Sequence, residues 1–204
     1  MNINLLLIIS IGLVSYLSFS NQALFSNLLF SPYQIVQKKE WYRFLTSAWL
    51  HADFMHLFIN LFVLFSFGNY LERYLSIDFG NSAGELYLIL FLGSTIIAHL
   101  PAFIKFKNNF NYSAVGASGG VSGVLFAYII INPMSMLQLY LFIPIPAIVF
   151  GLLYLWYSYY MSKKNIDNIG HDAHLYGAIG GMGILTVFKP TVWGGFLQQI
   201  LALF

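Results

Sequence analysis

Four polar side chains in an otherwise apolar sequence are of the types that carry out hydrolytic chemistry together. Ser118 lies in the glycine-rich run 115–123, His56 and Asn60 are four residues apart, and His174 follows a polar loop. An imidazole titrates near neutral pH, so it can take the proton of a serine hydroxyl and return it to a leaving amine. The residue types therefore predict Ser118 as a nucleophile and His174 as its base.

Donors for an oxyanion accompany this pair. His56 and Asn60 share one face of a helix because they are four residues apart. The backbone N–H of Ser118 sits where a helix begins and its N–H groups lack partners. We expect these three donors to hold the oxyanion of a tetrahedral intermediate. No acidic third member is expected, because Asp172 is two residues from His174 and points elsewhere on a helix.

The glycine-rich run leaves two serines as candidates for the nucleophile. It contains two G-x-S-G tetrads, at 116–119 and 120–123, which place Ser118 and Ser122 one helical turn apart. Ser118 is favoured because it is closer to the helix N-terminus, where free N–H groups remain. The same small residues are also typical of close packing between membrane helices, so the run alone fits a purely structural role equally well.

A metal site is the alternative use of the histidines. His51 and His56 are five residues apart, an unfavourable spacing for two ligands on one helix, and no carboxylate or Cys completes a set. The sequence contains no Cys, which excludes disulfides, thiol catalysis and Cys-ligated metals. We therefore expect neither a metal nor a cofactor. Histidines packed between helices without any chemistry are the remaining alternative.

The elements that must position these side chains are membrane helices. The 204 residues are 59% hydrophobic and 8% charged, with a mean hydropathy of +0.74, whereas soluble domains carry about 25% charged residues. Such a composition predicts an all-α polytopic membrane protein in contact with lipid. A net charge of +2 without a run of Lys or Arg gives no indication of nucleic-acid binding.

Six apolar segments predict a single membrane domain over residues 1–204. The expected spans are residues 3–19, 49–75, 85–104, 116–131, 146–160 and 172–188. The first is expected to be a retained span, because no Lys or Arg precedes it and no clear cleavage site follows. Residues 21–46 are expected to lie in the membrane interface, and the tail after residue 190 along the membrane surface.

This order of spans brings the candidate residues to one side of the membrane. His56 lies near the start of the second span, Ser118 starts the fourth and His174 starts the sixth. Even-numbered spans all begin on the same side, so these side chains are expected at a similar depth. Polar side chains are costly within lipid, which makes them functional candidates.

Several motifs together resemble the rhomboid family of intramembrane serine proteases, over about residues 40–181. The matching patterns are Trp41-Tyr42-Arg43, then H-x4-H-x3-N at His51, His56 and Asn60, G-x3-E at Gly68 and Glu72, G-A-S-G at 116–119, and A-H-x-x-G-x3-G from Ala173 through His174 and Gly177 to Gly181. Each motif is weak by itself, and their order and spacing make the set specific.

The resemblance implies a six-transmembrane-helix rhomboid-like bundle that cleaves the transmembrane segments of single-pass membrane proteins. Ser118 would be the nucleophile and His174 the base, with His56 and Asn60 in the oxyanion region. A structural role is left open for His51. An inactive rhomboid-like protein that binds membrane clients is the alternative, and a small transporter would need ionisable groups along a full path.

The resemblance also implies structural roles. Arg43 and Glu72 would brace loops, and Gly177 and Gly181 would let the sixth span pack tightly against the fourth. The family often has an aromatic residue, stacked near the catalytic histidine, where Ser122 stands in this chain. The fifth span and the segment before the sixth would be the substrate entry and its cover.

The family topology implies an inner (plasma) membrane location with both termini in the cytoplasm and the site opening away from it. That orientation conflicts with the distribution of positive charge. Seven Lys and Arg residues would lie on the outer side, against only Arg73 and Lys189 inside, contrary to the positive-inside rule. The resemblance favours the family orientation.

Overall fold

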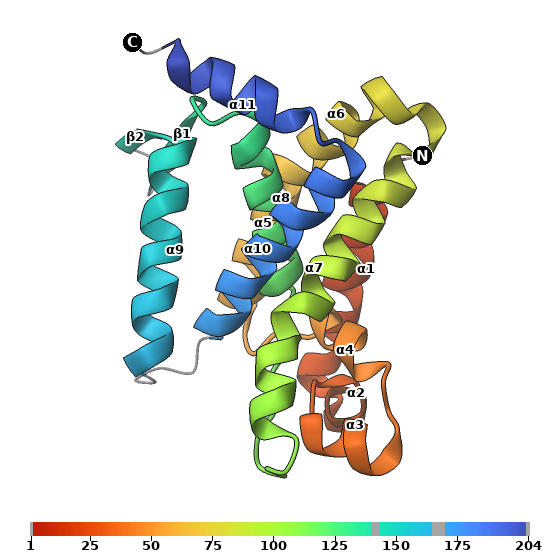
Figure 1. Ribbon diagram of the computed structural model, residues 1–204. Helices are drawn as coiled ribbons and strands as arrows, with labels where there is room; N and C mark the ends of the chain where they lie inside the picture. The colour runs from red at the N-terminus through yellow and green to blue at the C-terminus, as the bar shows by residue number, and fades with distance from the viewer. Residues whose placement is uncertain (1, 140–142, 165–169, 203–204) are drawn as a thin grey trace.

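A computed structural model of the chain describes residues 2–139, 143–164 and 170–202 as a bundle of helices with one small hairpin (Figure 1). The helices that form the body of the bundle are α1 (Ile3–Ser20), α5 (Phe54–Val63), α7 (Ala83–Phe106), α8 (Ser118–Ile131), α9 (Ala147–Lys164) and α10 (His171–Phe188). The predicted all-α fold class is confirmed.

The remaining elements join these helices or follow the last of them. They are α2 (Gln22–Leu28), α3 (Pro32–Lys38), α4 (Arg43–Thr46), the 3-10 helix η1 (Ser47–Trp49), the π-helix η2 (Leu64–Gly68), α6 (Asn69–Phe79), the 3-10 helix η3 (Gly80–Ser82), α11 (Val192–Leu201), and the strands β1 (Met136–Leu139) and β2 (Ile143–Pro146). Residues 21–46 thus form three short helices. The two strands pair antiparallel, with Met136 opposite Pro146.

Length and composition do not by themselves establish six spans. Within the described residues, Ile3–Ser20 and Phe54–Phe106 are long and apolar enough to cross a membrane. The second stretch turns back at Gly80, whose φ is 53°, so that α6 packs on α7. The pair α10–α11, bent by 111°, is a third candidate. The exact number of spans stays a prediction.

α8 is the central helix of the bundle. It is apolar on all sides, which is typical of a buried helix, and nearly all of its residues are buried against the surrounding helices. Its 14 residues make it about 21 Å long, less than the roughly 30 Å of a bilayer's hydrocarbon core. The glycine-rich run forms its first two turns.

Glycines let α10 approach α8 at the level of the backbone. A Cβ on Gly177 would overlap the carbonyl oxygen of Gly119, and a Cβ on Gly181 would overlap that of Gly123. On the other side of α8, a Cβ on Gly119 would lie 2.5 Å from the Ala98 Cβ of α7. The three helices α7, α8 and α10 are therefore fixed relative to one another by positions that accept no side chain.

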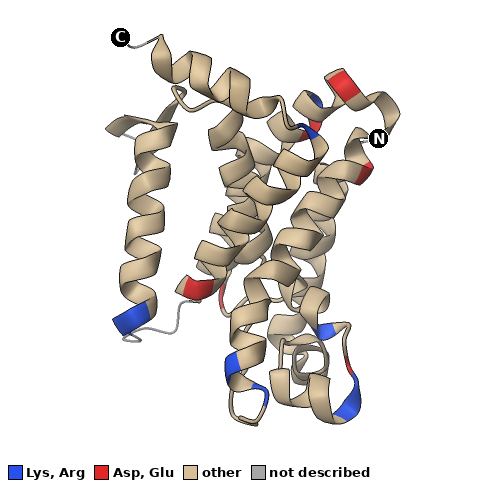
Figure 2. Cartoon of the chain, in the orientation of Figure 1, with Lys and Arg blue, Asp and Glu red and all other residues tan. Residues whose placement is uncertain are grey.

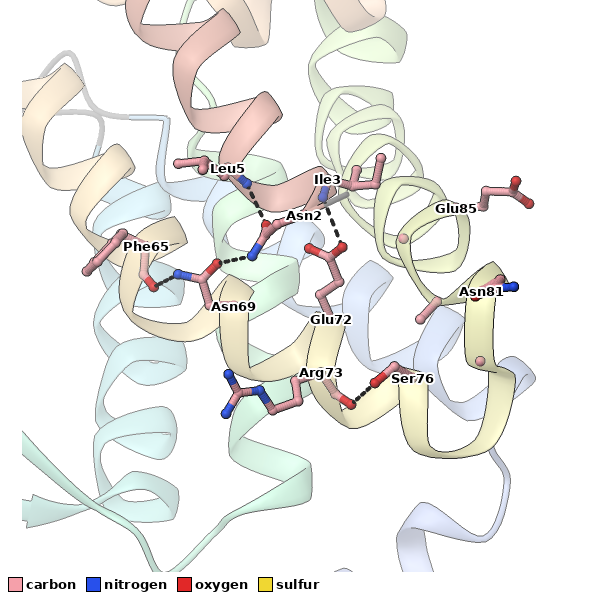
Figure 3. Close-up of a pocket in the computed structure, with 13 residues that line it drawn as sticks. Asn2, Ile3, Leu5, Phe65, Asn69, Glu72, Arg73, Ser76, Asn81 and Glu85 are labelled. Atoms are coloured by element: carbon pink, nitrogen blue, oxygen red, sulfur yellow. Dashed lines mark hydrogen bonds between the residues drawn. The ribbon is translucent and has the colours of Figure 1, made fainter.

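Glu72 of α6 holds the start of α1, at the end of the bundle opposite to the start of α8. Its two carboxylate oxygens accept the backbone N–H groups of Ile3 and Asn4, each at 2.9 Å, at the positive end of the α1 dipole (Figure 3). The side chain of Asn4 donates to the Leu64 carbonyl and accepts from the Tyr87 hydroxyl. Glu72 also lines a hollow of about 780 Å³ at this end.

Charged residues lie at the two ends of the described bundle, and the middle of the described bundle carries none (Figure 2). Lysines and Arg43 gather around α3, α4 and the ends of α7 and α9. Lys189 pairs with Asp78 at the other end. The central band exposes large apolar side chains such as Phe58, Leu152 and Trp156, as a surface facing lipid would.

We expect Gly177→Ala to lower the free energy of unfolding by about 1–3 kcal/mol, because its methyl group would overlap the Gly119 carbonyl oxygen. Gly183→Ala on the same helix is the matched control. Nothing lies within 4 Å of a Cβ at Gly183, so this change should be neutral or stabilising by up to about 1 kcal/mol. Thermal unfolding in detergent micelles measures both, and equal stabilities would contradict the close approach of the helices.

Candidate active site

The chain enters α8 through a backbone conformation that favours glycine. Gly116 has φ 125°, and a Cβ there would lie 2.7 Å and 2.9 Å from two ring atoms of His56. Two residues later, Ser118 is the first residue of α8. Because the first N–H groups of a helix have no partner within it, the Ser118 hydroxyl stands beside backbone donors.

Ser118 and His56 face the same small space. An ideal Cβ on Gly116 would lie 2.9 Å from Nε2 of His56 and 3.8 Å from Oγ of Ser118. His56 is held at the start of α5, where its backbone N–H donates to the Asp53 carboxylate at 2.8 Å. One turn later, the buried Asn60 side chain donates to the His56 carbonyl at 2.9 Å. An amide has two N–H donors, so one remains for another acceptor.

His174 lies in the first turn of α10, where that helix meets the start of α8. Its backbone N–H donates to the Gly170 carbonyl at 3.1 Å. A Cβ on Gly119 would lie 3.8 Å from the Ala173 carbonyl, so the residues next to Ser118 and next to His174 are in contact. The side chains of Ser118 and His174 are both half-buried. The packing of the two helices thus brings the predicted nucleophile and base to the same end of the bundle.

His51 holds the loop that precedes Ser118. It is fully buried, and its Nε2 accepts the backbone N–H of Ala117 at 3.3 Å. Its Nδ1 lies 2.8 Å from the hydroxyl of Ser15, which itself donates to the Trp49 carbonyl. Nδ1 must therefore carry the proton, and His51 is neutral with one defined tautomer. This geometry assigns it a structural contact with the nucleophile loop.

A second buried histidine supports the same loop from α7. The Gly116 N–H donates to the Ser47 carbonyl at 3.0 Å, and the Ser47 hydroxyl lies 3.4 Å from Nε2 of His99. Nδ1 of His99 bonds to the Thr95 carbonyl at 2.7 Å. His99 was not predicted from the sequence as a functional or supporting residue, although a histidine within an apolar segment is by itself a functional candidate.

The two candidate serines differ in their surroundings. Ser122 is buried one turn deeper in α8, and its Oγ lies 2.6 Å from the hydroxyl of Tyr154 on α9. Ser118 is half-buried at the helix start. Tyr154 was likewise not predicted from the sequence as part of the site. It lies on the inward face of α9 with the buried Gly151 and Ser158, and this spacing of small residues was the available signal.

The remaining predicted residues lie away from Ser118. Arg43 is buried beside the short helices, where it donates to Glu40 at 2.6 Å and to the carbonyls of Ser26 and Leu29 at 3.0 Å and 2.8 Å. Glu72 belongs to α6, which lies at the end of the bundle opposite to the short helices α2, α3 and α4 (Figure 1). In the described part of the chain, no three His, Asp or Glu side chains gather closely enough to hold a metal ion.

Comparisons with known proteins agree on one family. The Rhomboid domain model matches residues 38–190, which include every candidate site residue. "Putative rhomboid protease YdcA" of Bacillus subtilis is 32% identical over 149 residues, covering 72% of this chain and 66% of that protein. "RHOMBOID-like protein 12, mitochondrial" of Arabidopsis thaliana is 28% identical over 144 residues, covering 66% and 42%.

A shorter match extends the range of relatives. "Rhomboid-like protein 11, chloroplastic" of Arabidopsis thaliana is 38% identical over 95 residues, or 47% of this chain and 30% of that protein. The chain thus spans less than two thirds of the length of these relatives. With a domain match over three quarters of its residues and the apolar helices described above, the chain is an integral membrane protein that belongs to the rhomboid family.

Proposed function

We propose that the chain is a serine-type endopeptidase that cleaves transmembrane segments of single-pass membrane proteins with a Ser118–His174 dyad. Family membership supports an intramembrane protease type of function. The observation that carries the residue assignment is the contact between α8 and α10. Gly119 and Ala173, the neighbours of the two proposed catalytic residues, lie side by side at one end of the bundle, where a Cβ on Gly119 would be 3.8 Å from the Ala173 carbonyl oxygen.

The reaction follows from the chemistry of these groups. His174 takes the proton of Ser118 as Oγ attacks the scissile carbonyl carbon, and the carbonyl electron pair moves to its oxygen. Collapse of this tetrahedral intermediate breaks the C–N bond, and the imidazolium gives its proton to the leaving amine. His174 next deprotonates a water molecule that attacks the acyl-enzyme ester. Collapse of this second tetrahedral intermediate breaks the C–O bond to Ser118, the imidazolium returns the proton to Oγ, and the carboxylic acid product leaves.

The proposed oxyanion donors are the Ser118 N–H and the side chains of His56 and Asn60. Their support is that His56 and Ser118 face one small space and that Asn60 keeps an amide N–H to donate. Loss of one such donor typically costs about a hundred- to thousand-fold in rate. The substrate helix must unwind locally, because its peptide carbonyls are otherwise engaged in helical hydrogen bonds.

We propose the family orientation, with the site opening away from the cytoplasm, although the charges at the two ends argue the other way. Most Lys and Arg residues of the described chain lie at the end of the bundle that carries Ser118 (Figure 2). The predicted inner plasma membrane location is not supported, because the relatives include mitochondrial and chloroplastic proteins beside a bacterial one.

Labelling with a fluorophosphonate probe tests the dyad. We expect Ser118→Ala to abolish labelling and His174→Ala to slow it by at least about a thousandfold, because the hydroxyl loses its base. Ser122→Ala should still be labelled at residue 118, as peptide mass analysis will show. Labelling of Ser118→Ala, or client binding without labelling of the parent chain, would contradict the proposal and favour the inactive alternative.

The roles of the two neighbouring histidines are separable. His51→Ala leaves the Ala117 N–H without its acceptor and should lower the free energy of unfolding by about 1–3 kcal/mol as well as slow labelling. His56→Ala should slow labelling by roughly a hundredfold or more with a smaller loss of stability, since its ring is only half-buried. Unfolding curves and labelling rates are measured on the same preparations. Unchanged stability of His51→Ala would contradict its structural role.

A further inference from the structure

A tyrosine from outside the two catalytic helices packs on the proposed base. The rings of Tyr154 and His174 have centroids 5.9 Å apart with planes inclined by 28°, a stacked arrangement. The Tyr154 hydroxyl lies 2.6 Å from Oγ of Ser122. Tyr154 therefore links α9, which carries it, to α10 through its ring and to α8 through its hydroxyl.

The Tyr154 ring is itself held in place from two sides. Phe126 of α8 lies with its ring centroid 5.5 Å away, and Phe150, one turn earlier on α9, lies 6.0 Å away. His171 meets the His174 ring edge-on, with centroids 5.9 Å apart and planes inclined by 78°. His174 thus lies among aromatic rings, and of these the Tyr154 ring is the one inclined least to the imidazole plane, in a stacked arrangement.

We propose that Tyr154 is a positioning residue for His174, held in place by Ser122. This inference rests on the proposed function of the Ser118–His174 pair. A histidine at the start of a helix turns about two side-chain bonds, and only one orientation aims Nε2 at the serine hydroxyl. A flat ring stacked on the imidazole limits that rotation, and its π face also favours the imidazolium that forms during the reaction.

The small side chain at residue 122 is part of this arrangement. Ser122 is buried one turn after Ser118 and leaves room for the Tyr154 hydroxyl next to α8. A large aromatic residue at 122 would compete for the space that Tyr154 occupies. The ring stacked on His174 therefore comes from α9 in this chain, and α8 contributes the hydrogen bond of Ser122 and the packing of Phe126 on that ring.

Kinetics of a transmembrane peptide substrate test the proposal. Tyr154→Leu removes the ring, and we expect kcat to fall by roughly 10- to 100-fold with KM nearly unchanged, because a misplaced catalytic group costs up to about a hundredfold. Tyr154→Phe keeps the ring and loses only the hydrogen bond, so kcat should fall by about fivefold. Trp156→Leu removes an exposed ring on the outer face of the same helix, so it is the matched control and should keep kcat close to that of the parent.

Two further variants keep the test decisive if Tyr154→Leu fails to fold. Ser122→Ala combined with Tyr154→Phe should be no slower than either single change, because all three lack the same hydrogen bond. Ser122→Phe combined with Tyr154→Leu should recover part of the lost kcat by supplying a ring from α8. A packing residue alone would not give this recovery.

The outcomes separate this proposal from the proposed function. A parent chain that cleaves the substrate and is labelled at Ser118, together with a Tyr154→Leu variant of unchanged kcat, would overturn the role of Tyr154 alone. A Tyr154→Leu variant whose KM rises at constant kcat would make Tyr154 a substrate-binding residue and would equally overturn it. A parent chain that is neither labelled nor active would overturn the dyad itself.

Discussion

The structure depends on the backbone contact between α8 and α10. Inside a membrane, lipid tails are as apolar as the side chains, so helices are held together by close packing and hydrogen bonds more than by burial of apolar surface. Gly177 and Gly181 face the carbonyl oxygens of Gly119 and Gly123 with no side chain between them. The distance between the two helices is thereby set by van der Waals contact between backbone atoms, and this contact also determines how far apart the starts of the two helices lie.

The loop before α8 is held by hydrogen bonds to its backbone. Ala114 pairs with Phe30, Gly116 donates to Ser47, and Ala117 donates to His51. Two buried histidines support this loop, His51 directly and His99 through Ser47, and each has hydrogen-bond partners on both ring nitrogens. A neutral imidazole can donate and accept at once, so it satisfies two buried partners without placing a charge in a medium of low dielectric constant.

The sequence predicted the features that follow a local pattern along the chain. It did not predict the contacts between residues that are far apart in the sequence. Long apolar runs gave the all-α class, and the motif spacings led to Ser118, His56 and His174, whose roles stay predictions. The strands β1 and β2 were not predicted, because a short apolar run followed by Pro144 and Pro146 gives no helical or alternating period. Tyr154 was hidden among the aromatic residues of α9, since its partners lie on α8 and α10 and no local spacing announces them.

The shortness of α8 has a consequence for where a peptide bond can be cut. With its far end at the headgroups, a helix of about 21 Å covers only some two thirds of the hydrocarbon thickness. Ser118 would then lie roughly 9 Å inside the opposite boundary of the hydrocarbon core. For the proposed protease, the length of α8 would therefore set the height in the bilayer at which a peptide bond can reach the Ser118 hydroxyl.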